Sequence, residues 1–114
     1  DPVYHLLTLR FDGGVVRVGN GARQPGERVR LQVLARDVSL TLARQQDTSV
    51  LNHVPARVEA LGAADTPAHV LVRLIAGEGG APLLARVTRL SADQLGLTPG
   101  QTVWAQIKAV ALLA

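Results

Sequence analysis

Cysteine and methionine are absent from this chain of 114 residues, and phenylalanine, tryptophan and tyrosine occur once each. The lack of cysteine excludes disulfide bridges and thiolate metal sites. Three aromatic residues are too few for the platforms on which single-stranded nucleic acids stack, so we do not expect nucleic acid as a partner. Lysine is also rare, because Lys108 is the one lysine among twelve basic residues.

Aliphatic residues make up for these absences. Hydrophobic residues account for 47% of the chain, which excludes intrinsic disorder, and the core must consist mainly of Val, Leu, Ala and Ile. The length allows one domain or two very small ones. No apolar run approaches the roughly 18 residues of a membrane span, and the N-terminus does not resemble a signal peptide. Since the first residue is not methionine, we interpret the chain as a fragment of a longer protein.

Alternation of apolar and polar residues predicts β-strands along most of the chain. Residues 4–11 and 15–18 are expected to form a hairpin around Asp12-Gly13-Gly14, and residues 20–26 a loop. Pro55 predicts an edge strand or a bulge. Residues 91–96 have the signature of one helical turn, with Ser91 as N-cap and Gly96 as the stop. The other expected strands cover residues 28–33, 37–42, 50–61, 70–75, 83–88 and 103–113.

An internal repeat relates the two halves. Residues 25–33 align without a gap on residues 99–107, with Pro, Gly, Val and Gln identical at four of the nine positions. A hairpin with a Gly-rich turn precedes both segments. We therefore predict a duplicated β-unit whose first copy lacks its opening strand, with a truncated first unit at residues 1–47 and a second unit at residues 48–114. The fold class is all-β, a small OB-fold-like β-barrel with one short helical turn.

No arrangement of residues predicts catalysis, so the chain is not expected to be an enzyme. The histidines, His5, His53 and His69, lie far apart and lack metal-ligand spacing. Residues 77–80 are Gly-rich but lie between two strands, which is typical of a hairpin turn and not of a phosphate-binding loop. The net charge of +3 comes with arginines spread along the chain, which favours solvated strand faces over a nucleic-acid surface.

Three polar groups remain as candidates for binding an anion. Lys108 is a compact ammonium donor beside the small Ala109, although a solvent-facing lysine on an edge strand is the plainer interpretation. Thr88 and Ser91 flank the start of the helical turn, where hydroxyls and free N–H groups can hold an anion, or where Ser91 is simply an N-cap. Thr48-Ser49 and Asn52 form the third group, which is equally typical of a loop before a strand.

Four segments resemble the C-terminal accessory region of the ATP-binding subunit of bacterial molybdate ABC transporters. They are Leu34-Ala35-Arg36-Asp37-Val38-Ser39-Leu40, Thr48-Ser49-Val50-Leu51-Asn52, Leu84-Ala85-Arg86-Val87-Thr88 and Ala105-Gln106-Ile107-Lys108-Ala109-Val110. Their order and spacing extend over nearly the whole chain. The helical turn and the Ile-Lys strand are also similar to the wider group of molybdate-binding (Mop, TOBE) domains.

The resemblance implies a regulatory, dimerising module that binds molybdate or tungstate at a subunit interface and needs no cofactor or metal. By the same resemblance, the oxyanion ligands are Ser49, Asn52, Thr88, Ser91, Lys108 and Ala109. The implied partners are a second copy, the protein's own N-terminal ATPase domain and a membrane permease subunit. This places the protein in the cytoplasm, at the inner face of the membrane; the ATPase domain itself is not expected in these residues.

Two positions depart from the family pattern. Leu51 stands where many molybdate binders have arginine, and Ala109 stands where serine is commoner. Loss of one charge-assisted hydrogen bond, worth about 1.5–3 kcal/mol, weakens binding roughly tenfold to a hundredfold. Either another arginine such as Arg86 substitutes, or the pocket is weak or vestigial. The alternative function is thus a structural dimerisation tail that binds no ligand, with Leu51 buried where the arginine once lay.

Overall fold

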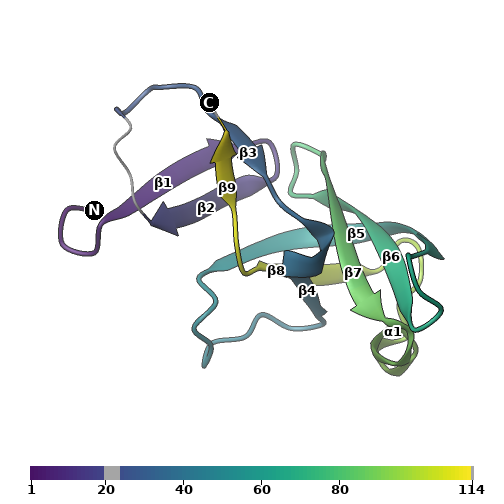
Figure 1. The fold of residues 1–114 in the computed structure, drawn as a ribbon. Helices are drawn as coiled ribbons and strands as arrows, with labels where there is room; N and C mark the ends of the chain where they lie inside the picture. The colour runs from purple at the N-terminus through teal and green to yellow at the C-terminus, as the bar shows by residue number, and fades with distance from the viewer. Residues whose placement is uncertain (20–23, 114) are drawn as a thin grey trace.

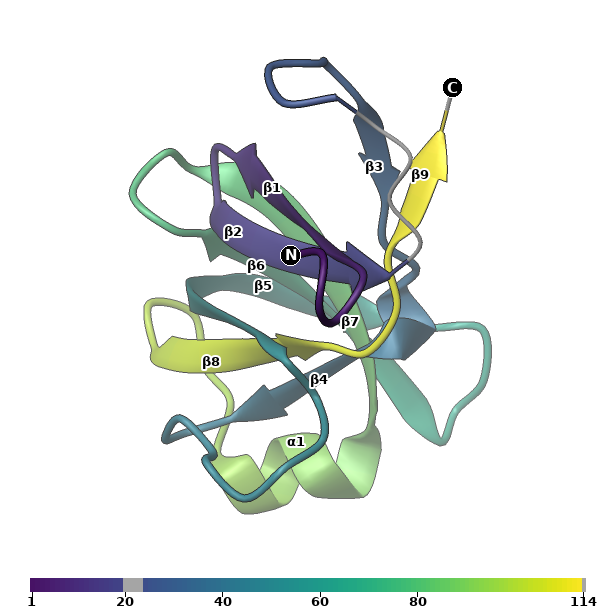
Figure 2. The same ribbon diagram turned by 90° about the vertical axis from the view of Figure 1, so that its left-hand side faces the viewer.

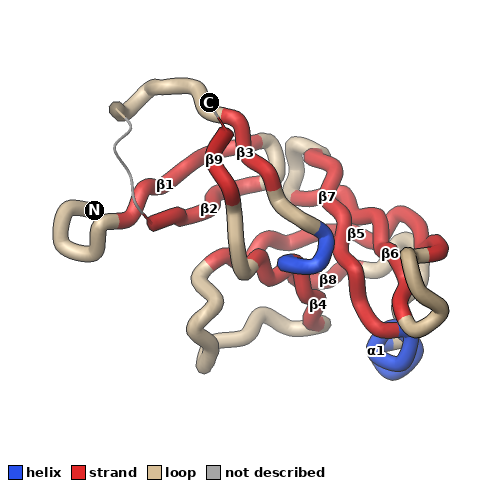
Figure 3. The backbone as a smooth tube through the Cα atoms, viewed as in Figure 1, coloured by secondary structure: helices blue, strands red, loops and turns tan. Residues whose placement is uncertain are grey.

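A computed structural model describes residues 1–19 and 24–113, so part of the predicted loop at residues 20–26 lies outside the described residues. Strands dominate, and the described helical segments are one turn of 3-10 helix at Ala35–Asp37 and one short α-helix (Figures 1 and 3). The elements are β1 (Leu6–Phe11), β2 (Gly14–Gly19), β3 (Arg30–Gln32), β4 (Val38–Thr41), β5 (Asn52–Ala63), β6 (His69–Ala76), β7 (Ala81–Thr88), α1 (Arg89–Leu95), β8 (Thr102–Ile107) and β9 (Ala111–Leu113).

The main sheet has five antiparallel strands in the order β4-β8-β5-β6-β7. Its two outer strands, β4 and β7, also contact each other, so the sheet curls into a half-barrel with α1 at one end (Figure 2). The hairpin β1–β2 and the pair β3–β9 form two smaller sheets. This architecture confirms the predicted all-β, OB-like fold. Among the described residues, no helix has the length and apolar character that a membrane span requires.

Small aliphatic side chains fill the inside of the half-barrel, as the shortage of aromatics predicts. Val72, Leu74, Ala76 and Ala85 from neighbouring strands are almost completely buried. Val16 joins the same cluster from β2, so the first hairpin packs against the main sheet. Burial of aliphatic side chains in one shared core is therefore the main interaction that holds the elements together.

Of the two alternatives predicted from Pro55, the edge strand is wrong, because β5 is the central strand of the main sheet. Proline is tolerated there since the pairing of β5 with β6 begins only at Ala56. The Pro55 carbonyl accepts a hydrogen bond from the Gly77 N–H (2.8 Å) in the turn that follows β6. The N and C=O of one strand residue point to the same edge, so the missing N–H falls beside that turn. The bulge of β5 lies further on, between Val58 and Ala60.

Helix α1 begins at Arg89, and its N-cap is Thr88, three residues before the predicted N-cap Ser91. The Thr88 hydroxyl oxygen accepts the Ser91 N–H at 3.0 Å, so Ser91 is a residue of the first turn and its assignment as N-cap is wrong. Two hydroxyl residues at this spacing compete for the cap, and threonine wins because its backbone is extended (φ −69°, ψ 149°). Gly96 ends the helix in the left-handed conformation (φ 62°), as predicted.

The two Pro-Gly turns of the predicted repeat have the same geometry. Gly26 and Gly100 both have positive φ, at 85° and 90°. The residues that follow them, Glu27 and Gln101, each donate a backbone N–H to the carbonyl three residues earlier, at 3.1 and 3.2 Å. Each side-chain oxygen also accepts the backbone N–H of that earlier residue, at 3.0 and 3.1 Å. One local structure therefore occurs twice, at the entries to β3 and β8.

The predicted strand at residues 103–113 is interrupted. It forms β8 and β9, with Lys108–Val110 between them. The Lys108 N–H donates to the Asp37 carbonyl (2.8 Å), which is the next position in the register of β8 with β4, and the chain then leaves the main sheet. Strands cross the predicted boundary at residues 47 and 48 in both directions. β4 pairs with β8 in the main sheet, and β9 returns to pair with β3. The division into units 1–47 and 48–114 stays a prediction, based on the internal repeat in the sequence.

Candidate functional site

The first candidate group, Thr88 and Ser91, lies where β7 ends and α1 begins. Both residues are exposed. The Thr88 hydroxyl donates to the Ser91 hydroxyl at 2.8 Å while it accepts the Ser91 N–H. This arrangement leaves the Ser91 hydroxyl hydrogen to point outward as a donor. The pair thus presents one hydroxyl donor at the surface beside the first turn of the helix.

The second group is divided between a loop and a strand. Ser49 is exposed in the long connection between β4 and β5, whereas Asn52 is the first residue of β5 and is buried. The Asn52 side chain bonds the backbone of Arg17 in β2 twice: its Oδ1 accepts the Arg17 N–H at 2.7 Å, and its Nδ2 donates to the Arg17 carbonyl at 2.9 Å. The amide group of Asn52 therefore joins the first hairpin to the main sheet.

The third group lies at the break between β8 and β9. Lys108 and Ala109 are exposed, and the Lys108 backbone is held by Asp37. The residue before them, Ile107, pairs across the sheet with Asn52. Lys108 therefore follows the residue that pairs with Asn52, so the pairing of β8 with β5 brings the backbones of these two candidates near each other, although Asn52 is buried and Lys108 is exposed. Within the described part of the chain, no hydrogen bond connects Thr88 or Ser91 with either of them.

Arg86, the substitute considered for the missing arginine, is already engaged. Its Nε donates to Asp65 Oδ1 at 2.8 Å, and its Nη2 lies 3.2 Å from His69 Nδ1. The hydrogen bond from Arg86 lowers the pKa of Asp65, as expected for a carboxylate beside a guanidinium. In the single chain, Arg86 is thus paired with the exposed carboxylate of Asp65.

Leucines flank the candidate polar groups at the surface. Leu51 is 57% exposed next to Asn52, and Leu90 is 65% exposed between Thr88 and Ser91. The sequence interpretation of Leu51 as a buried apolar residue is thus wrong for the single chain. A large aliphatic side chain gains free energy when it is removed from water. Two such residues beside polar groups are typical of a surface that a second molecule covers.

Sequence reasoning missed His53, which lies beside Asn52 and is half-buried. Its Nε2 lies 2.6 Å from the Val50 carbonyl, so it holds the end of the loop that carries Ser49. Its Nδ1 is buried and has no hydrogen-bond partner among the described residues. The neighbouring loop residue Arg44 lies over the Trp104 ring, 5.8 Å from the ring centroid. Sequence spacing does not signal the contact of Arg44 with Trp104, because Arg44 lies in the loop before β5 and Trp104 lies in β8.

The fold and these sites define the class, a small OB-like β-barrel module with exposed hydroxyl and ammonium donors. A TOBE-domain family model matches residues 48–114, and the chain belongs to the TOBE-domain family. The chain is 58% identical over 113 residues to the molybdenum import ATP-binding protein ModC 1 of Azotobacter vinelandii. It is 56% identical over 116 residues to the molybdenum import ATP-binding protein ModC of Pseudomonas aeruginosa.

These matches cover 99% and 100% of this chain but 31% and 32% of the relatives, so the chain spans about a third of their length. The resemblance predicted from the sequence is confirmed, and the 114 residues lack an ATP-hydrolysing domain. A solved structure of the cytoplasmic molybdate-binding protein ModG, with molybdate bound, has a similar fold. Its TM-score is 0.66 at 29% identity, and the match covers 74% of this chain and 60% of that one.

Proposed function

We propose that this chain is the regulatory and dimerisation module of a molybdate-import ABC transporter ATPase, and that it binds molybdate or tungstate between two subunits. The observation that carries the proposal is the pairing of Asn52 in β5 with Ile107 in β8, the residue that directly precedes Lys108. The relatives that are molybdenum import ATP-binding proteins, and the molybdate-binding ModG of similar fold, support the choice of ligand.

The proposed ligands have different roles. Lys108 supplies the positive charge, Ser49 and Ser91 supply hydroxyl donors, and Ala109 supplies a backbone N–H. Asn52 is a positioning residue, because its amide is used by Arg17 in the single chain. A dianion removed from water needs several donors, because an underpaired buried charge costs several kcal/mol. The donors of one chain are spread over separate elements, so a second chain is needed to surround the ligand.

The exposed leucines support the two-chain arrangement. Leu51 precedes Asn52, and Leu90 precedes Ser91. Both leucine side chains are more than half exposed in the single chain. A two-fold dimer would cover both in a self-complementary interface. In the longer protein, the other partners are the ATPase domain and a membrane permease subunit. The module would then lie in the cytoplasm at the inner face of the membrane.

Isothermal titration of the chain with molybdate, tungstate and sulfate tests the proposal. We expect heat with the first two and less with sulfate, and Lys108→Ala should weaken binding roughly tenfold to a hundredfold, because it removes a charge-assisted hydrogen bond. Arg10→Ala is the matched control: it removes one positive charge from an exposed position on β1 and should leave the affinity unchanged. Absence of heat with all three anions refutes the ligand assignment.

The second candidate function is a dimerisation tail without a ligand. It is favoured by the full engagement of Asn52 with Arg17 and by Leu51 in the place of an arginine. The variant Leu51→Arg separates the two functions. If the module is an oxyanion binder with one contact missing, the new guanidinium should tighten molybdate binding by about tenfold to a hundredfold. If titration of Leu51→Arg shows no gain in molybdate affinity, and sedimentation shows that the dimer persists, the result supports a dimerisation tail without a ligand.

A further inference from the structure

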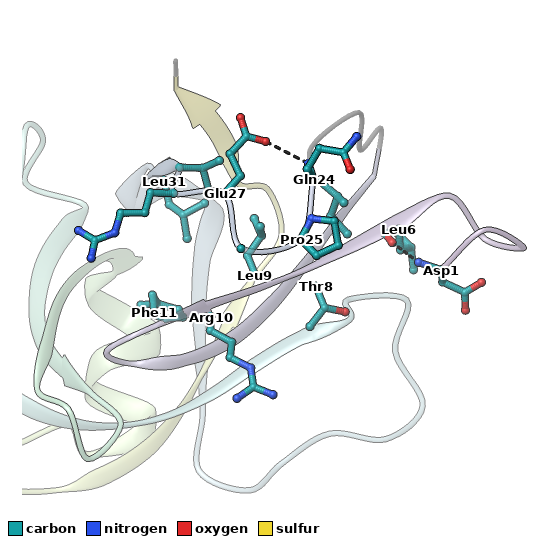
Figure 4. Close-up of a pocket in the computed structure, with 14 residues that line it drawn as sticks. Asp1, Leu6, Thr8, Leu9, Arg10, Phe11, Gln24, Pro25, Glu27 and Leu31 are labelled. Carbon is teal, nitrogen blue, oxygen red and sulfur yellow. Dashed lines mark hydrogen bonds between the residues drawn. The ribbon is translucent and has the colours of Figure 1, made fainter.

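An apolar groove separates β1 from the segment that leads into β3. It has a volume of about 900 Å³ and is lined by β1 on one side and by residues 24–29 and Leu31 on the other. Figure 4 shows Leu9 and Phe11 on the β1 side, with Pro25, Glu27 and Leu31 across the groove. Leu9, Phe11 and Leu31 are only half-buried although they pack against the core. We call this hollow the β1–β3 groove.

The same place is occupied by a strand in the second half of the molecule. Strand β8 corresponds to β3, because each follows a Pro-Gly turn of the same geometry. The hairpin β6–β7, which precedes β8 in the chain, corresponds to the hairpin β1–β2, which precedes β3. In the main sheet, β5 lies between β8 and β6 and pairs with both. In the first half, the position between β3 and β1 is the β1–β3 groove. The groove therefore has the location of one absent strand.

The edge of β1 that borders the groove is ready for such a strand. Asp1 and Leu6 exchange two backbone hydrogen bonds, Leu6 N–H to Asp1 O (3.3 Å) and Asp1 N to Leu6 O (2.6 Å). This is the bonding of an antiparallel pair across a tight turn. Since amide groups alternate between the edges of a strand, Thr8 and Arg10 point to the same edge as Leu6, away from β2. The chain before Asp1 is thus directed along the free edge of β1.

We propose that the β1–β3 groove binds an extended strand from the polypeptide that precedes Asp1, antiparallel to both β1 and β3. The relatives have room for this segment, because this chain spans about a third of their length. Half-buried Leu7, Leu9 and Phe11 alternate along β1 with exposed Thr8 and Arg10. The matching strand must therefore alternate apolar and polar residues, without proline at bonded positions. Through β3, which pairs with β9, the added strand connects the preceding domain to the segment that carries Lys108.

Amide hydrogen exchange tests this proposal. The chain is compared with a version extended by its native preceding residues, about ten in number, which is enough for a strand of about 5–6 residues. We expect the Thr8 and Arg10 amides to exchange at least roughly tenfold more slowly in the extended protein, because they gain partners. The amides of β2 should be unaffected. Equal exchange rates in both proteins overturn the proposal. Protection of these amides in the shorter chain that increases with protein concentration also overturns it, because it identifies a second copy of the chain as the occupant of the groove.

The variant Thr8→Pro provides an independent test. Proline has no N–H, so it should lower the urea midpoint of the extended protein, where that N–H is bonded, and leave the shorter chain nearly unchanged. Thr8→Ala is the matched control, since it removes the exposed hydroxyl but keeps the N–H, and it should affect neither protein. An equal loss from Thr8→Pro in both proteins contradicts the added strand.

Discussion

Replacing Asn52 with alanine is expected to lower the free energy of unfolding by about 2–6 kcal/mol, because two backbone groups lose their partner at about 1–3 kcal/mol each. Those groups are the N–H and the carbonyl of Arg17, which Asn52 bonds at 2.7 and 2.9 Å. Asn52 itself is 8% exposed, so water does not easily replace its amide. Urea denaturation, with the midpoint and slope compared between the two proteins, measures the loss.

Arg17→Ala is the control for this prediction. Asn52 bonds only the backbone at position 17, and the Arg17 side chain is exposed, so the change should stay within about 0.5 kcal/mol. A loss below about 1 kcal/mol for Asn52→Ala would show that the hairpin is not joined to the main sheet through this amide. The destabilisation is expected without any oxyanion present, which distinguishes it from a purely ligand-binding role.

Gly77→Ala is expected to cost about 2–5 kcal/mol, from two separate causes. Gly77 has φ 63°, a conformation that costs an alanine about 1–2 kcal/mol. A Cβ on Gly77 would also collide with the backbone carbonyl of Gly13, where the turn after β6 meets the turn after β1. The shift needed to relieve such overpacking costs about 1–3 kcal/mol more. Thermal or urea unfolding of the variant measures the total.

Two neighbouring glycines separate these causes. Gly80 has φ 75°, but the nearest atom to its Cβ would be 3.9 Å away, so Gly80→Ala should show the conformational cost alone. Gly79 has no positive φ, but its Cβ would collide with the Asp12 carbonyl, so Gly79→Ala should show the collision alone. If Gly77→Ala costs no more than Gly80→Ala, the two hairpin turns do not touch in solution.

Much of the local structure was predictable because it depends on neighbours in sequence. The alternation in residues 4–18 predicts the first hairpin, and the Pro-Gly turns at residues 25–26 and 99–100 are alike in sequence and in structure. The sequence did not predict element boundaries that depend on which of several possible partners a residue bonds. Thr88 and Ser91 both suit an N-cap, and the strand at residues 103–113 is divided because its first part pairs with β4 and β5 and its last part pairs with β3.

The sequence predicted which types of residue form the candidate site, but it did not predict how these residues are arranged in space. Lys108 as the one lysine, and the family resemblance, were visible in the sequence. The register of β5 against β8, which pairs Asn52 with the residue before Lys108, depends on the packing of both strands in one sheet. Leu51 is 57% exposed in the single chain, and whether a second molecule covers it is not determined by the local sequence.

The sequence by itself determined the composition of the core, the all-β class, the repeated turn and the family. These follow from hydrophobic periodicity and from backbone preferences that act over a few residues. The tertiary structure alone decided which partners the polar side chains have. Asn52 bonds a residue 35 positions away, and Arg86 bonds one 21 positions away, so neither partner is readable from local spacing. Polar side chains take whichever partner the folded strands bring within hydrogen-bond distance, and that choice requires the whole fold.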